Sequence, residues 1–220
     1  MSETKKGICI SVISLVLFNV LICLLEFVDV QEVGLYGLNH TYLKEYNKAV
    51  DIISDVLFYI VIAFGVFLVG FTIYKLIKRE ANYKFYSFFI VLAFVVLTFI
   101  IFEFCVTINT RPYPIDGKIE SSFPSTHVFI TTYIMLASPY MFLKMEGNKG
   151  LEKQNKLGFE EIVTIIMLVV ILLMTILRLY SGMHWLTDCI GGLILGVFYY
   201  GVYYLIISII KNKKSEKSLE

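Results

Sequence analysis

The sequence predicts an all-α integral membrane protein, folded as a bundle of six transmembrane helices. Hydrophobic residues make up 58% of its 220 residues and charged residues only 17%, whereas soluble domains contain roughly 45–50% and about 25%. The mean hydropathy is +0.77. Six continuous apolar stretches meet or approach the roughly 20 residues that cross a hydrocarbon core about 30 Å thick. These observations exclude a soluble globular domain, a disordered chain and a disulfide-rich secreted scaffold.

The six predicted spans occupy most of the chain and leave room for one membrane domain, residues 1–220. In order, they are Gly7–Phe27, Ile52–Ile77, Phe85–Ile108, His127–Leu143, Ile162–Leu179 and Cys189–Ile210. The first is predicted to be a retained helix rather than a signal peptide, because no small-residue cleavage pattern follows it. The second is long and the fourth short, which helix tilt can absorb. Continuous rather than alternating hydrophobicity disfavours a β-barrel.

The lysines and arginines predict how the bundle is oriented. Segments on the N-terminal side of the membrane would carry Lys5, Lys6, Lys75, Lys78, Arg79, Lys84, Lys144, Lys149, Lys153, Lys156, Lys211, Lys213, Lys214 and Lys217. The opposite side would carry only Lys44, Lys48, Arg111, Lys118 and Arg178. By the positive-inside rule, both termini are predicted to be cytoplasmic. The loops at 111–124 and 178–188 would then be extracytoplasmic.

The rarest polar residues collect at the predicted outer ends of the spans. Two of the three arginines and two of the three histidines lie there. Ionisable groups at membrane depth are costly and usually functional. The topology would bring together three fragments: Arg111-Pro112, Pro124-Ser125-Thr126-His127, and Arg178-x5-His184-x3-Asp188.

These fragments contain the parts of a phosphate site. Pro124 and Ser125 suit the start and the cap of the fourth helix, and the N–H groups of a first helical turn attract anions. The planar guanidinium groups of Arg111 and Arg178 match phosphate oxygens.

The histidines add reactive groups to this site. His184 and Asp188 are four residues apart, so on a helix they share a face. A carboxylate there can hold one imidazole nitrogen and leave the other free as a nucleophile or base. His127 could protonate a leaving group. Taken singly, the arginines could be interfacial anchors, the histidines structural residues and Asp188 a cap. The joint pattern favours phosphoryl transfer.

In this order and on six spans, the fragments resemble the type 2 phosphatidic acid phosphatase (PAP2) superfamily, whose pattern is Lys-x6-Arg-Pro, Pro-Ser-Gly-His and Ser-Arg-x5-His-x3-Asp. The resemblance covers roughly residues 85–210, the expected catalytic core. It implies a PAP2/acid phosphatase-like fold and a hydrolase of lipid phosphate esters or pyrophosphates that needs no metal or other cofactor.

The resemblance also implies a role for each matching residue. His184 would attack phosphorus and become transiently phosphorylated, with Asp188 orienting it. His127 would protonate the departing oxygen and then activate water. The residues expected to hold the phosphate oxygens are Arg111, Ser125, Thr126 and Arg178.

Three positions depart from the family pattern. Phe104 stands at the lysine position, Thr126 at the glycine and Leu177 at the serine before the last arginine. A lysine and a hydroxyl that could donate to phosphate are therefore missing, and a charged hydrogen bond is worth about 1.5–3 kcal/mol. Lys118, in the same outer loop, is a hypothetical substitute, and a catalytically weakened member of the family is an alternative.

The expected substrate is a phospholipid or polyprenyl phosphate in the bilayer: phosphatidate, phosphatidylglycerol phosphate or undecaprenyl diphosphate. The sequence does not choose among these. A lipid phosphotransferase of the same fold and a non-enzymatic transporter or scaffold remain alternatives, although a transporter usually has ionisable groups near mid-membrane. The net charge of +1 gives no basic field for nucleic acid, and the oligomeric state stays open.

Small residues in the spans have a structural interpretation. The four cysteines show no metal-ligand spacing and are predicted to be packing residues; they are Cys9, Cys23, Cys105 and Cys189. Four glycines follow Asp188 on the last span, where they would permit close helix packing; they are Gly191, Gly192, Gly196 and Gly201.

Overall fold

A computed structural model describes residues 2–27, 42, 44–113, 120–142 and 158–217 of the chain. Its helices, in order, are α1 (Glu3–Phe27), α3 (Lys48–Ile77), α4 (Tyr83–Phe104), α5 (Thr126–Phe142), α6 (Phe159–Tyr180) and α7 (Leu186–Lys217). The all-α, six-helix prediction is confirmed. Five of these helices are long and apolar enough to cross a membrane, while α5 has 17 residues. The chain is a multi-pass integral membrane protein.

Local capping groups set helix boundaries that hydrophobicity alone misplaces. α3 begins at Lys48, before the predicted start, because the Asn47 side chain accepts hydrogen bonds from the N–H groups of Ala49 (3.1 Å) and Val50 (3.2 Å). The third span was predicted to reach Ile108, which is wrong, since α4 ends at Phe104. The chain turns there although its side chains remain apolar.

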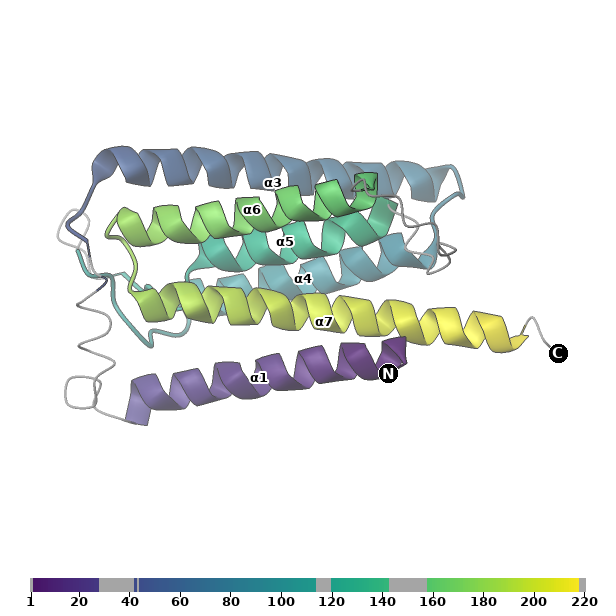
Figure 1. The fold of residues 1–220 in the computed structure, drawn as a ribbon, viewed down its shortest axis with the longest axis horizontal. Helices are drawn as coiled ribbons and strands as arrows, with labels where there is room; N and C mark the ends of the chain where they lie inside the picture. The colour runs from purple at the N-terminus through teal and green to yellow at the C-terminus, as the bar shows by residue number, and fades with distance from the viewer. Residues whose placement is uncertain (1, 28–41, 43, 114–119, 143–157, 218–220) are drawn as a thin grey trace.

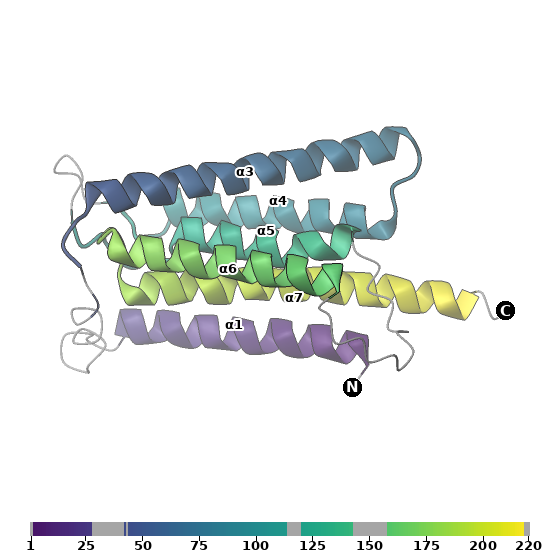
Figure 2. The same ribbon diagram turned by 45° about the horizontal axis from the view of Figure 1, so that its top comes forward.

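Helix α7 is the central element of the bundle. It packs against α1, α4, α5 and α6, while α3 packs against α4, α5 and α6. In Figures 1 and 2, α7 lies between α1 and the other helices, and α3 forms the edge opposite α1. The C-terminal ends of α4 and α6 and the N-terminal ends of α3, α5 and α7 meet at one end of the bundle. We call this the site end.

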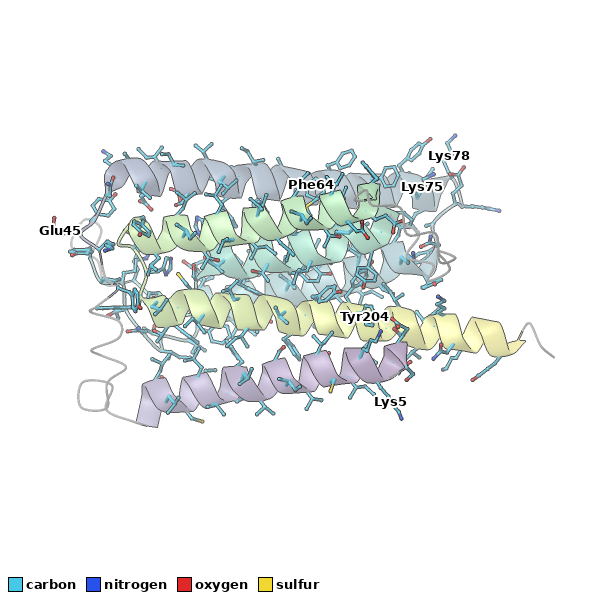
Figure 3. The ribbon with its side chains drawn as sticks, in the orientation of Figure 1. Lys5, Glu45, Phe64, Lys75, Lys78 and Tyr204 are labelled. Carbon is cyan, nitrogen blue, oxygen red and sulfur yellow. The ribbon has the colours of Figure 1, made fainter. Side chains whose placement is uncertain are left out.

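The labelled charged residues are divided between the two ends. Figure 3 shows Lys5, Lys75 and Lys78 at the end away from the site end, and Glu45 at the site end. Between the ends, large apolar side chains cover the outward faces, as at Tyr59, which is 69% exposed. Such faces suit contact with lipid tails.

The glycines of α7 allow the close packing that the sequence predicts. A Cβ atom on Gly192 would lie 2.7 Å from the carbonyl oxygen of Ser125, at the start of α5. On Gly196 it would lie 2.5 Å from the Thr132 Cβ, one turn further along. α5 and α7 therefore touch almost backbone to backbone beside the site end.

We expect Gly192→Ala to destabilise the protein by about 1–3 kcal/mol, because α7 would have to move away from α5. Thermal unfolding in detergent should then occur roughly 3–10 °C lower than in the wild type. Gly70→Ala on α3 is the matched control, since a Cβ there meets nothing within 4 Å. Equal unfolding temperatures for the two variants would contradict the close-packing interpretation.

Candidate active site

The turn between α6 and α7 holds the third predicted fragment in place. α6 ends at Tyr180, and the Ser181 N–H bonds back to the Leu177 carbonyl. Gly182 follows with φ of 76°, a conformation that favours glycine after a helix. A Cβ atom there would also lie 2.6 Å from the Lys44 carbonyl oxygen. This turn connects α6 to α7 and places His184 just before the start of α7.

His184 is nearly fully buried and its ring has a defined orientation. Its Nδ1 atom lies 3.1 Å from the main-chain carbonyl oxygen of Ser122 and 3.5 Å from Oδ2 of Asp188. A carbonyl oxygen can only accept, so Nδ1 carries the proton. The lone pair is therefore on Nε2. The Ser122 carbonyl is the nearer of the two partners, and sequence reasoning had named only Asp188.

Asp188 is fully buried in the first turn of α7 and is held from two sides. Its Oδ2 accepts a hydrogen bond from the Trp185 N–H at 3.0 Å, and its Oδ1 accepts one from the Asn109 side chain at 3.3 Å. Its main-chain carbonyl accepts from the Ser125 N–H at 3.0 Å. One residue thus joins the α4–α5 connection, the start of α5 and the start of α7.

The start of α5 presents donors without partners inside the helix. Thr126 is its first residue, and Ser125 precedes it. Ser125 stands at the predicted cap position, where its carbonyl accepts a hydrogen bond from the Phe129 N–H at 2.9 Å. Its hydroxyl has no hydrogen-bond partner among the described residues, so the side-chain part of the cap is not formed. The first-turn N–H groups of α5, which include those of Thr126 and His127, have no partner within the helix. These groups can donate to an anion.

Arg178, in the last turn of α6, is almost completely buried and is held by α3. Its Nη1 atom lies 2.9 Å from Oδ1 of Asp51 and 3.3 Å from Oδ1 of Asp55. The same nitrogen donates to the Ser54 hydroxyl at 3.0 Å. The Nε atom has no hydrogen-bond partner among the described residues. One edge of the guanidinium is therefore fixed, and Nε remains available to a ligand.

Arg111 lies in the connection between α4 and α5, where two segments of the chain are hydrogen-bonded to each other. Its N–H donates to the Glu120 carbonyl at 3.1 Å, beside an isolated bridge between Thr110 and Ser121. Its Nε atom is 3.2 Å from Oε2 of Glu120. The Trp185 indole donates to the Thr110 carbonyl at 2.7 Å, which fastens this connection to the α6–α7 turn.

His127 contacts α3 through both its edge and its face. Its Nε2 atom lies 3.1 Å from Oδ1 of Asp55. Its ring lies on that of Phe58, with centroids 4.0 Å apart and planes 32° from parallel. The Nδ1 atom is buried and has no hydrogen-bond partner among the described residues.

Three buried polar atoms at this end of the bundle lack a partner among the described residues: Ser125 Oγ, His127 Nδ1 and Arg178 Nε. A fourth, Arg111 Nε, makes no well-directed hydrogen bond but is paired by charge with Glu120, 3.2 Å away. Buried polar atoms in proteins are normally paired. Ser125 and Arg178 can donate to an oxygen-rich anion, and His127 can do so when its ring is protonated. Together with the α5 N-terminus, they suit a phosphate group.

Burial lowers the pKa of His184 well below its usual range, and the nearby charges of Arg178 and Arg111 lower it further. The ring is therefore neutral at pH 7, with Nε2 unprotonated. A neutral imidazole close to two guanidinium groups can act as a nucleophile toward a phosphorus atom held by those groups.

The structure brings His184, Asp188 and Arg178 together, and places His127 and Ser125 beside them. Arg111 is near enough for its charge to act on His184. The lysine position of the family pattern, Phe104, is 75% exposed at the end of α4. Lys118 lies outside the described residues.

Sequence reasoning missed the contribution of α3. Asp51, Ser54 and Asp55 are spaced as i, i+3 and i+4, which puts them on one helical face, and all three contact Arg178. The available signal was Asp55 itself, an acidic residue inside a predicted span. The Ser122 carbonyl, being main chain, offered no such signal.

Comparisons with known proteins identify the family and the fold of the chain. Residues 94–211, more than half of the chain, match the sequence family described as the PAP2 superfamily. The chain is also similar to the crystal structure of a transmembrane PAP2-type phosphatidylglycerolphosphate phosphatase from Bacillus subtilis, with a TM-score of 0.60 and 18% identity. That similarity covers 95% of this chain and 96% of the other, and it shows a shared fold. No curated protein matches the chain.

We expect the His184 ring to remain neutral well below pH 6.5, the ordinary histidine pKa. Since its pKa is lowered, protonation begins only as the pH falls through that lowered value. In histidine-labelled protein in micelles, its NMR signal should stay at the neutral-ring position as the pH falls from 8 through 6.5. His184→Gln identifies the signal by removing it. A midpoint at or above pH 6.5 would contradict the burial argument.

Proposed function

The chain belongs to the PAP2 superfamily, and we propose that it is a membrane lipid phosphate phosphatase that works through a phosphohistidine on His184, without a metal. The observation that carries this proposal is the orientation of one ring. Nδ1 of His184 is engaged by the Ser122 carbonyl and faces Asp188. Nε2 is thereby the nucleophilic atom, in an environment that keeps it unprotonated.

In the first step, the Nε2 lone pair of His184 forms a bond to phosphorus as the bond from phosphorus to the leaving oxygen breaks. That oxygen takes a proton from His127 and departs as the lipid alcohol, or as a lipid monophosphate if the substrate is a diphosphate. Arg111, Arg178, Ser125 and the N–H of Thr126 hold the non-bridging oxygens, as donors aimed at developing charge. The Nδ1 proton stays between His184 and its carbonyl partner.

In the second step, water attacks phosphorus and gives a proton to His127. The phosphorus–nitrogen bond breaks, its electron pair returns to Nε2 of His184, and inorganic phosphate leaves. His127 therefore serves as acid and then as base, and both histidines end in their starting protonation states.

The position of the site supports a lipid substrate. The candidate residues lie at the ends of membrane-spanning helices, the level at which phospholipid headgroups are found. Because Lys5, Lys75 and Lys78 lie at the other end, the positive-inside rule supports an extracytoplasmic site and cytoplasmic termini. Phosphatidate, phosphatidylglycerol phosphate and undecaprenyl diphosphate are the substrates to test first.

We expect purified protein in detergent to release inorganic phosphate from at least one of these three lipids. His184→Ala should lower the rate by at least about a thousandfold, because no other group replaces the nucleophile. EDTA should leave the rate unchanged. Gly70→Ala, far from the site, is the matched control for handling and folding.

Equal release by wild type and His184→Ala would overturn the assigned nucleophile, and strong inhibition by EDTA would overturn the metal-free mechanism. Release from none of the lipids by folded wild-type protein would favour a non-enzymatic role. Adding an acceptor alcohol distinguishes the phosphotransferase alternative, since a new phosphorylated alcohol would then form in place of inorganic phosphate.

A further inference from the structure

One carboxylate oxygen on α3 serves two groups of the candidate active site. Oδ1 of Asp55 lies 3.1 Å from Nε2 of His127 and 3.3 Å from Nη1 of Arg178. Asp51, one turn earlier on the same face, contacts Arg178 at 2.9 Å. Both aspartates precede the region that matches the family, residues 94–211. They are therefore features of this chain that the family match does not assign.

We propose that Asp55 is a positioning residue that orients His127 so that its Nδ1 atom exchanges the proton with the leaving oxygen and with water. This inference rests on the proposed phosphatase function. It assigns Asp55 to the leaving-group side of the reaction, as the counterpart of Asp188 on the nucleophile side.

The hydrogen-bonding geometry determines which nitrogen of His127 is available for proton transfer. An ionised carboxylate only accepts, so the Nε2 atom of His127 must carry a proton toward Asp55. Nδ1 is then the nitrogen that gains and loses the catalytic proton. It is buried and has no hydrogen-bond partner among the described residues. The Phe58 ring, 4.0 Å away between centroids, fixes the plane of the imidazole from the same helix.

Arg178 in turn holds Asp55. The guanidinium is 2% exposed, whereas the Asp55 side chain is 43% exposed and would otherwise be free to rotate into water. Asp55 is therefore in contact with Arg178 on one side and with His127 on the other. It couples the group that would hold the phosphate to the group that would protonate the leaving oxygen, with α3 as the common support.

The charge on Asp55 matters most when His127 is protonated. The carboxylate stabilises the imidazolium that forms when the ring takes a proton from water, and it keeps the charged ring in the same orientation for the next leaving group. An amide at this position could still accept from Nε2–H, but it would not supply the charge.

We expect Asp55→Asn to lower the rate of hydrolysis by an amount that depends on the leaving group of the substrate. Two phosphomonoesters with the same alkyl chain form the test, one leaving as an alkyl alcohol and the other as a nitrophenol. An alkoxide needs the proton from His127, whereas a nitrophenolate does not. The value of kcat/KM, which reports the phosphorylation step, should fall about 10- to 100-fold for the alkyl ester and less than about 3-fold for the nitrophenyl ester.

Asp51→Asn is the matched control. Asp51 shares the helix face and the contact with Arg178, but its described contacts do not include His127. Any loss in this variant should therefore be the same for both esters. In a His127→Ala background, Asp55→Asn should add no further difference between the two esters, because the group it positions is gone.

A loss in Asp55→Asn that is equal for the two esters would overturn the proposal, and so would no loss at all. A second measurement does not depend on activity. Nitrogen-15 NMR of labelled protein, at a pH at which the His127 ring is neutral, should show the Nε2–H tautomer in wild type, with a changed signal in Asp55→Asn. The Nδ1–H tautomer in wild type would overturn the proposal even if the protein is an active phosphatase. Wild-type protein with this pairing but no phosphatase activity would refute the proposed function instead.

Discussion

The burial of Arg178 is the interaction on which the site end of the bundle depends. A guanidinium group does not lose its proton in proteins, so a buried one must be compensated by carboxylates and hydrogen bonds. α3 supplies these at Asp51, Ser54 and Asp55, all on one face. This requirement fixes how α3 sits against α6, and it brings Asp55 within reach of His127.

Main-chain contacts complete the arrangement on the other side of the site. The Ser122 carbonyl holds His184, and the Asp188 carbonyl receives the Ser125 N–H. The near contact of α5 with Gly192 brings the two helix starts together. The His184 ring is thus positioned by backbone atoms and by a fully buried carboxylate. Such supports lose little entropy when a ligand binds, because they are ordered beforehand.

Sequence reasoning predicted the proximity of those candidate residues that are close together along the chain. Arg178, His184 and Asp188 lie within one helix end, one turn and one helix start, so their spacing alone predicts that they meet. The roles of Asp51 and Asp55 depend on which helix packs against α6, and hydrophobic spans do not encode their order around a bundle. The end of α4 was also misplaced, because hydropathy does not register the turn after Phe104. The contact of the Ser122 carbonyl with His184 could not be predicted, because every residue type has a main-chain carbonyl.

The acidic residues also decide how the site can bind an anion. Arg178 faces two carboxylates and Arg111 faces one, Glu120, so neither arginine offers a full unopposed charge. A phosphate that enters gains less Coulomb attraction than two free guanidinium groups would give. Binding must then rely on directed hydrogen bonds, from Nε of Arg178, the Ser125 hydroxyl and the first turn of α5. Hydrogen bonds of this kind strengthen when charge moves onto the non-bridging oxygens. The same neutralisation favours departure of inorganic phosphate, the product that would otherwise remain bound most tightly. The missing lysine at Phe104 and the aspartates on α3 therefore act in the same direction, toward a site that binds the anion less tightly and holds its two histidines in a fixed orientation.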